Sequence, residues 1–132
     1  ERQRLEQLAI ELGISPRVRF LGLVPNQDVA KLHAAADLFV LSSRLEATPT
    51  VVLEALACGT PVVALERGGV LDIAEDGRHG VLYREGDGLA AAIDKARQIR
   101  FNRGDLRNRA EMFSGAHFQK KIKALLPGKI AT

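Results

Sequence analysis

Short apolar runs alternate with helical segments along most of this chain, and this alternation constrains the fold more than any other feature. Segments with apolar residues at three- and four-residue steps indicate helices. Strands that alternate with helices predict a parallel sheet covered on both faces by right-handed crossovers. We therefore expect an α/β fold, a Rossmann-like parallel sheet with helices on both faces. The runs typical of strands lie at residues 18–21, 38–41, 61–65 and 81–83.

The run at residues 38–41 is continuously apolar, which predicts a strand buried on both faces. After it, Thr48 and Pro49 predict the start of a helix, because Thr caps free backbone amides and Pro fits the first helical position. Gly59 ends that helix. The other helices are expected at residues 1–12, 27–36, 70–74 and 87–100, from residue 104 onward, and at residues 116–126.

Size and composition fit one domain over residues 1–132. The chain is 46% hydrophobic, which suffices for one core. Only 5% of the residues are aromatic, so a stacking platform for nucleic acid is not expected. The single cysteine excludes an intrachain disulfide, and no apolar stretch approaches the roughly twenty residues that span a bilayer. We therefore expect a cytoplasmic protein without a nucleic-acid partner.

Basic residues dominate the end of the chain. From Lys95 onward, ten Lys and Arg residues stand against only Asp105 and Glu111. We expect residues 95–132 to form a basic helical tail packed on the domain. A strip of this kind can draw a protein to anionic lipid, which would place it peripherally at the inner membrane surface. The alternative interpretation is a solvated helical face.

Residues 42–61 carry the strongest functional signal, because they lead from a strand into a helix at the carboxyl edge of the sheet, where ligands bind. Free amides around Thr50 and Val51, together with the helix dipole, favour an anion such as a diphosphate. Glu54 is the only charge between Val51 and Cys58 and shares a face with Thr50. A buried carboxylate there suits neutral hydroxyl donors such as those of a ribose. The alternative is an exposed helix glutamate.

Other candidate groups give weaker signals. Glu46, in the loop before the helix, could accept hydrogen bonds from sugar hydroxyls, cap the loop or pair with Arg44. Cys58 follows an apolar segment and is expected to be a small buried side chain rather than a nucleophile. The histidines lack ligand spacing, so no metal site is expected at His33, His79 and His117.

The spacing Glu46-x7-Glu54, followed by Ala-Cys-Gly-Thr-Pro-Val-Val-Ala, resembles the donor site of glycosyltransferase family 4 and related retaining enzymes of the two-domain GT-B architecture. Further segments resemble those of the family in the same order. They lie at residues 19–25, 36–42, 68–69 and 75–80.

The resemblance implies a partial C-terminal domain of a GT-B fold. Such a domain binds a nucleoside-diphosphate sugar, whose sugar is transferred with retention to a hydroxyl acceptor, namely a sugar, a lipid-linked sugar or another hydroxyl compound. It implies no cofactor and no metal. A stabilised oxocarbenium-like sugar and leaving diphosphate would account for catalysis.

The resemblance also assigns roles to residues. Glu54 would hold the ribose, and Glu46 would contact the donor sugar as the catalytic residue, beside Ala47 and Thr48. Backbone amides of Thr50 and Val51 would hold the diphosphate. The remaining positions are Val24, in the loop that would border the base, and Gly68 and Gly69, which would lie near the sugar or simply form a turn.

Two departures from the family pattern affect these expectations. Residues 47–49 replace the usual Gly-Phe-Gly or Gly-Phe-Pro, so close approach of the backbone to the sugar is less assured. The family's Arg and Lys that neutralise the diphosphate, its first strands and its acceptor domain precede the point where this chain starts. We therefore expect the chain alone to be inactive, to need an N-terminal acceptor domain as partner, and to self-associate through an exposed sheet edge.

Two other functions stay open. A non-hydrolysing nucleotide-sugar epimerase of the same fold would share the nucleotide site but would need further acid and base groups across the cleft. A non-catalytic α/β binding module would keep the scaffold without turnover. Analysis of the products separates the transferase from the epimerase, and a lack of transfer after the upstream strands and the basic pair are restored would favour the binding module.

Overall fold

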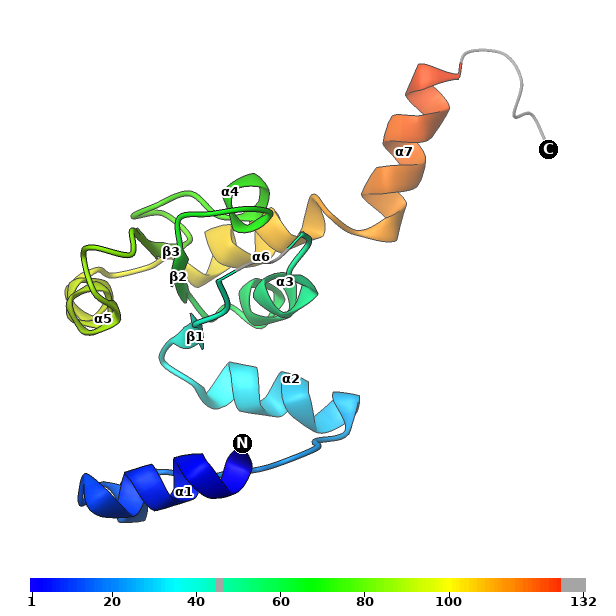
Figure 1. Ribbon diagram of the computed structural model, residues 1–132. Coiled ribbons are helices and arrows are strands. Elements are labelled where there is room, and N and C mark those ends of the chain that lie inside the picture. The colour runs from blue at the N-terminus through cyan, green and yellow to red at the C-terminus, as the bar shows by residue number, and fades with distance from the viewer. Residues whose placement is uncertain (45–46, 127–132) are drawn as a thin grey trace.

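The computed structural model describes residues 1–44 and 47–126, and a parallel sheet lies at the centre of this part of the chain. Its strands are β1 (Phe39–Leu41), β2 (Val62–Leu65) and β3 (Gly80–Tyr83), in the order β1-β2-β3. Val63, at the centre, pairs with Val40 on one side and with Val81 on the other. The predicted parallel α/β architecture is confirmed (Figure 1).

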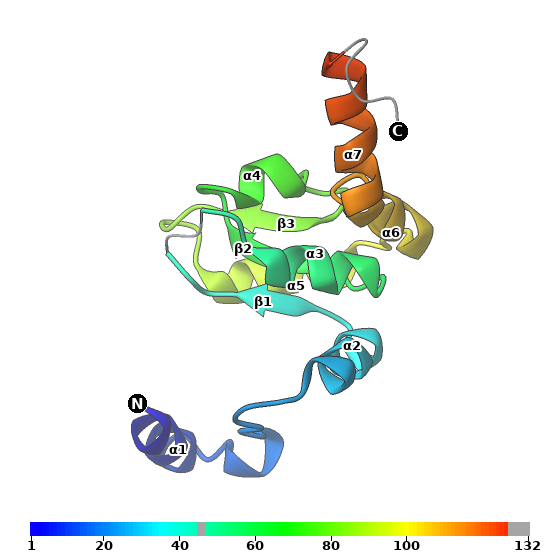
Figure 2. The same ribbon diagram turned by 90° about the vertical axis from the view of Figure 1, so that its right-hand side faces the viewer.

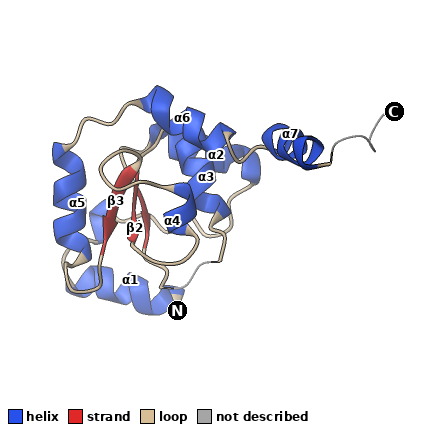
Figure 3. Ribbon diagram, turned by 90° about the horizontal axis from the view of Figure 1, so that it is seen from above, coloured by secondary structure: helices blue, strands red, loops and turns tan. Residues whose placement is uncertain are grey.

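Helices precede, connect and follow the strands, close to the predicted positions. Helix α3 links β1 to β2. Helix α4 links β2 to β3 (Figure 3). A short 3₁₀ helix, η1 (Ser15–Arg17), follows the first α-helix. The α-helices are α1 (Arg2–Glu11), α2 (Asn26–Ala35), α3 (Thr50–Ala57), α4 (Val70–Ile73), α5 (Leu89–Gln98), α6 (Arg103–Glu111) and α7 (Gly115–Leu125).

The central strand β2 separates two hydrophobic clusters, one on each face of the sheet. Side chains of a strand point alternately to its two faces, and Val62 belongs to the cluster that contains residues of α3, α4 and α6. Val63 belongs to the other cluster, which contains residues of α5. Every residue of β2 is buried, as the uninterrupted apolar run predicts.

The prediction that residues 38–41 are buried on both faces is wrong. Strand β1 is an edge strand that pairs with β2, and Val40 is 38% exposed. Along the other side of β1 the described residues contribute no strand. The apolar run alone could not distinguish an edge strand from a central one, because burial depends on the neighbours as well as on the side chains.

Residues 18–21 do not form the predicted strand. They run without regular structure, and Leu21 is 56% exposed. The carbonyl oxygen of Phe20 accepts a hydrogen bond from the Arg2 guanidinium at 3.2 Å. An extended segment becomes a strand only when its backbone joins a ladder, and no described strand lies beside this segment.

Helix α3 begins later than predicted, and Thr48 does not cap it. Pro49 occupies the capping position without a side-chain cap, and its carbonyl accepts the Val52 amide at 3.0 Å. Pro49 is buried against the loop at Gly69. This packing holds Pro49 before the helix rather than in its first turn.

The basic tail divides into two parts. Helix α6 packs on α3 and buries Leu106 completely. Helix α7 departs from the prediction of a packed tail, because none of its residues is buried and it projects from the body (Figures 1 and 2). The end of the predicted tail, residues 127–132, lies outside the described residues. Within residues 1–44 and 47–126, no helix has the length and apolar character needed to cross a membrane.

Candidate functional site

The loops that follow β1 and β2 touch at the carboxyl edge of the sheet. A Cβ atom on Gly69 would overlap the carbonyl group of Ala47 and would lie 3.1 Å from Cδ of Pro49. Gly68 has φ +60°, and its carbonyl accepts the Leu71 amide at 3.1 Å. The two glycines therefore build a tight turn whose backbone packs against the loop that leads into α3.

Helix α3 presents Glu54 to solvent, and the prediction that this carboxylate is buried is wrong. Val52, Ala55 and Leu56 form the buried face of the helix. Glu54 lies on the outer side, so the burial cost that we invoked from the sequence does not apply. The alternative, an exposed helix glutamate, is correct as far as burial is concerned.

Glu54 nevertheless lines a pocket of about 320 Å³ between α2 and α3. Both walls are helical, since α3 and its end supply one side and a single face of α2 supplies the other. The lining residues are Asn26, Val29, Ala30, His33, Glu54, Ala57 and Cys58. A mostly apolar pocket with a few polar groups at its rim is typical of a small-molecule site.

Asn26 and His33 were not among the sequence candidates, although a signal for them existed. Together with Val29 and Ala30 they follow the i, i+3, i+4, i+7 pattern that places residues on one helix face. His33 is only 8% exposed, and its ring meets that of Phe39 edge to face, with centroids 5.0 Å apart. This contact fixes α2 on the strand that leads to the site.

Cys58 also lines this pocket. It is partly exposed, which corrects the expectation of a buried side chain. Its thiol donates to the carbonyl of Ala30 at 3.5 Å and so connects the end of α3 to α2.

A second depression, of about 390 Å³, lies between α3 and the region of α6 and its end. It shares Glu54 and Ala57 with the first pocket, so these two residues form the ridge between the two hollows. Arg107, Glu111 and Phe113 lie only in the second hollow. Glu111 is therefore a nearby exposed carboxylate outside the first pocket.

Arginines follow the strands at the carboxyl edge; sequence reasoning gave Arg44 only a pairing with Glu46 and assigned Arg67 and Arg84 no role. Arg44 and Arg67 each lie 3.9 Å from Glu85, which they share. Arg84 lies 2.8 Å from Glu66, and this hydrogen-bonded carboxylate raises the pKa of Arg84. Each of these cations has a carboxylate partner, and the partners of Arg44 and Arg67 are held at long distance.

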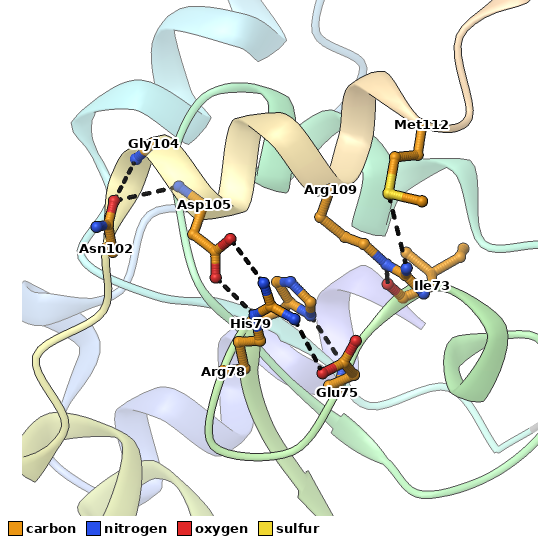
Figure 4. Close-up of polar contacts among 9 residues, drawn as sticks. All are labelled: Ile73, Glu75, Arg78, His79, Asn102, Gly104, Asp105, Arg109 and Met112. Carbon is orange, nitrogen blue, oxygen red and sulfur yellow. Dashed lines mark hydrogen bonds and ion pairs between the residues drawn. The ribbon is translucent and has the colours of Figure 1, made fainter. Parts of the chain in front are cut away.

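The shifted pKa values lie mostly at the opposite, amino edge of the sheet (Figure 4). Arg78 donates two hydrogen bonds to Asp105, at 2.7 and 3.0 Å, and these raise the pKa of Arg78 and lower that of Asp105. His79 is buried, and burial lowers its pKa; its Nδ1 accepts the Glu75 amide at 3.0 Å. This network precedes β3 and fastens α6 to the turn before that strand.

The segment 75–80, which contributed to the family resemblance, has a structural explanation in the same place. A Cβ atom on Gly80 would overlap the carbonyl group of Val62, so only glycine lets β3 approach β2 here. The carboxylate of Asp76 accepts the Leu82 amide at 2.8 Å and pairs with Lys95 at 3.1 Å. These residues build the sheet and do not approach the pocket.

The structure thus brings together only some of the predicted site residues. Glu54 shares a helix with Thr50 and Val51, which are both exposed. Ala47 is exposed and contacts Gly69, and the adjacent Thr48 is also exposed. Val24 is half-buried and does not line the pocket. Glu46 lies outside the described residues. Within those residues, no three His, Cys, Asp or Glu side chains come together as metal ligands.

A parallel sheet whose strands lead through their carboxyl ends into loops and helices defines a doubly wound α/β domain. The family model described as glycosyl transferases group 1 matches residues 1–113. The chain therefore belongs to that family.

Curated proteins with similar sequences are glycosyltransferases as well. A D-inositol 3-phosphate glycosyltransferase of Corynebacterium jeikeium is 45% identical over 82 residues, which are 62% of this chain and 20% of that protein. The lipopolysaccharide core biosynthesis glycosyltransferase LpsE of Rhizobium meliloti is 42% identical over 97 residues, which are 72% of this chain and 28% of that protein. The chain thus spans less than a third of the length of these relatives.

Solved structures confirm the predicted GT-B domain fold. Anabaena HepE, solved in complex with UDP and glucose, matches 93% of this chain with a TM-score of 0.75 and 30% identity, over 35% of its own length. The sucrose-phosphate synthase of Thermosynechococcus elongatus matches 94% of this chain with a TM-score of 0.79 and 29% identity, over 33% of its own length.

Proposed function

We propose that this chain provides the donor site of a retaining glycosyltransferase, which transfers a sugar from a nucleoside diphosphate to a hydroxyl acceptor. The observation that carries the proposal is that the exposed Glu54 lines the pocket between α2 and α3. Membership of the group 1 glycosyl transferases supports it. The complex of the similar protein HepE with UDP and glucose also supports it.

Glu54 binds the ribose of the donor in this proposal. An exposed carboxylate that lines a pocket can accept hydrogen bonds from two neighbouring hydroxyls, and it does so in ionised form without being buried first. The apolar pocket walls, formed by Val29, Ala30 and Ala57, receive the flat base. Asn26 offers both a donor and an acceptor at the same pocket, which is what recognition of a base edge needs.

The diphosphate lies at the beginning of α3. The first amides of a helix have no partner within the helix and carry the positive end of its dipole. Thr50 and Val51 hold these positions, and both residues are exposed. Gly69 packs against the same entry loop. In this assignment Gly68 and Gly69 keep side chains away from the sugar. Glu46 contacts that sugar in this assignment, as the resemblance implies.

A double-mutant-type cycle, which combines substitution of Glu54 with removal of the ribose hydroxyls from the ligand, tests whether Glu54 binds the ribose. Calorimetric titration compares UDP, GDP and ADP first, and the nucleotide that binds best is then compared with its 2′,3′-dideoxy form. We expect Glu54→Gln to weaken binding of the ribose form about 10- to 100-fold, the effect of losing hydrogen bonds to a charged group. The same substitution should change binding of the dideoxy form by less than about threefold.

Glu111→Gln is the matched control, because Glu111 is an exposed helix carboxylate that lines only the second hollow. It should leave both affinities unchanged. Equal weakening of the ribose and dideoxy forms by Glu54→Gln would contradict the ribose role. The reaction itself is tested by product analysis on a protein that joins this chain to an N-terminal acceptor domain, with an acceptor and the sugar nucleotide of the base that binds best: a glycoside with retained configuration is expected, whereas an altered sugar nucleotide would indicate an epimerase.

A further inference from the structure

Two cavities open at the carboxyl edge of the sheet, on the side that α5 covers. These edge cavities measure about 180 and 470 Å³, and Leu65, Tyr83 and Glu85 line both of them. Leu65 and Tyr83 belong to the hydrophobic cluster that contains residues of α5, whereas α3 covers the other face of the sheet (Figure 3). The edge cavities therefore lie across the sheet from α3, which forms one wall of the pocket at Glu54.

Arginines outnumber carboxylates around the edge cavities. The charged residues that line them are Arg44, Glu66, Arg67, Arg84 and Glu85. Arg84 pairs with Glu66 at 2.8 Å, so Glu85 is left to both Arg44 and Arg67. The two guanidiniums lie 3.9 Å from the same Oε1 atom of Glu85, which is too far for a hydrogen bond. This carboxylate therefore leaves their hydrogen-bond donors unused.

The buried floor of the edge cavities contributes a hydroxyl. Tyr83 is only 8% exposed and lines both cavities. Within residues 1–44 and 47–126, no residue forms a hydrogen bond with the Tyr83 hydroxyl, and no fully buried side-chain oxygen lacks a partner. The hydroxyl is therefore accessible, and it offers a neutral donor beside the two guanidiniums.

We propose that Arg44, Arg67 and the Tyr83 hydroxyl form an anion site for a phosphate or carboxylate group of a substrate. Guanidinium groups form strong hydrogen bonds with such oxyanions, often two in parallel. The hydroxyl of Tyr83 supplies a third donor from the floor. A cavity that combines a buried apolar floor with convergent polar groups is typical of a small-molecule site.

Glu85 occupies this place only weakly. Its side chain is 60% exposed, and surface ion pairs at such a distance contribute little to stability. An oxyanion that approaches within hydrogen-bond distance displaces Glu85 into solvent at small cost. Asp87 does not compete, because it lines neither edge cavity and its carboxylate accepts a backbone amide at 3.0 Å.

This inference rests on the proposed function and names a further substrate group. In the proposed function the base and ribose lie at the pocket between α2 and α3, and the diphosphate lies at the beginning of α3. The anion site lies on the opposite side of the sheet from α3. Its ligand is therefore an acidic group on the transferred sugar or on the acceptor.

NMR signals of the arginine Nε–H groups test the site without any nucleotide. The chain is titrated with glucose 6-phosphate at low ionic strength, with glucose as the neutral probe. The signals of Arg44 and Arg67 should shift saturably with glucose 6-phosphate and not with glucose. Arg67→Gln should raise the dissociation constant at least about tenfold, because hydrogen bonds to a charged group are lost.

Arg97→Gln is the matched control. Arg97 is exposed and also lies 3.9 Å from a carboxylate, that of Asp94, but it lines neither edge cavity. Its substitution removes the same charge and should change the dissociation constant less than about twofold.

Two further substitutions distinguish a binding site from a structural ion pair. Glu85→Gln should lower the dissociation constant severalfold, because it removes a like charge that competes for the same guanidiniums. Tyr83→Phe should raise it about threefold, the effect of losing one neutral hydrogen bond. An ion pair that serves only the fold would give no gain of binding in Glu85→Gln.

Sugar nucleotides identify the substrate that carries the acidic group. The nucleotide that binds best is compared as its glucose and its glucuronate derivative. Tighter binding of the glucuronate derivative by about tenfold, lost in Arg67→Gln, would assign the site to the transferred sugar. Equal binding of both derivatives, with glucose 6-phosphate bound at the same time, would assign it to the acceptor.

Three results would overturn the proposal. One is a titration with glucose 6-phosphate that leaves the Arg44 and Arg67 signals in place. Another is equal weakening by Arg67→Gln and Arg97→Gln, because net charge alone would then attract the anion. The third is displacement of glucose 6-phosphate by the neutral sugar nucleotide, which would place the phosphate in the diphosphate site. A failure of the donor site itself is seen separately, as a lack of nucleotide binding while glucose 6-phosphate still binds.

Discussion

The guanidinium Nε of Arg109 lies 2.6 Å from the carbonyl oxygen of Ile73. Its Nη2 also donates to the carbonyl of Asp72, at 2.8 Å. A single side chain of α6 thus donates hydrogen bonds to two carbonyl oxygens at the end of α4. These carbonyls have no amide partner in a following helical turn. The ring of Phe113 lies 5.3 Å from the same guanidinium.

We expect Arg109→Ala to lower the free energy of unfolding by about 2 kcal/mol, because hydrogen bonds to a charged donor are lost at partly buried carbonyls. Urea denaturation followed by circular dichroism measures this. Arg100→Ala, at an exposed position, should change the free energy by less than about 0.5 kcal/mol. Equal effects of the two substitutions would contradict the capping role of Arg109.

Gly69→Ala should destabilise the domain by roughly 3 kcal/mol, since its Cβ overlaps the backbone of Ala47 and the loops must separate. Gly86→Ala is the control. A Cβ there meets no atom within 4 Å, and its φ lies outside the left-handed region, so a change of less than about 1 kcal/mol is expected. An unchanged midpoint for Gly69→Ala would show that the two loops do not pack as described.

His79 should make stability depend on pH in the acidic range. Burial holds its folded-state pKa below the ordinary value of 6.5. Glu75 and Asp105 oppose this shift, and Arg109 and Arg78 add to it. The unfolded chain takes up the proton first as the pH falls, so the contribution is complete above pH 6.5 and is lost below it. The urea midpoint measured from pH 8 to 5 should fall, and it should fall less in a folded His79→Gln variant.

Cys58 offers a direct report on the pocket, because it is the single cysteine and is partly exposed at the pocket wall. A saturating nucleoside diphosphate should slow its reaction with a thiol reagent at least severalfold, since a bound ligand covers the sulfur. In Glu54→Gln the same protection should require a higher nucleotide concentration. Labelling that proceeds at one rate with and without a bound nucleotide would place the ligand elsewhere.

The burial of the central strand β2 was predictable because it follows from the strand's own residues. Four consecutive apolar side chains from Val62 to Leu65 suit burial on both faces, and β2 is buried throughout. Val40 and residues 18–21 are also apolar, but their burial and pairing depend on which segments lie beside them. Local sequence does not contain that information.

The candidate site shows the same division. The sequence placed Glu54 correctly on a helix that begins at the carboxyl edge, but a helix that is apolar almost all round does not show which face will be covered. Only the packing of α2 on α3 creates the pocket and adds Asn26 and His33 to it. Arg44 and Arg67 come near Glu85 through three separate loops, which no spacing in the sequence expresses.

The carboxylate of Asp76 makes the two edges of the sheet unequal as places for a further strand. By accepting the amide of Leu82, it occupies a backbone donor that β3 would otherwise offer to a neighbour. At the opposite margin of the sheet, β1 carries the partly exposed Val40. A further strand that extends this sheet therefore pairs more favourably with β1 than with β3.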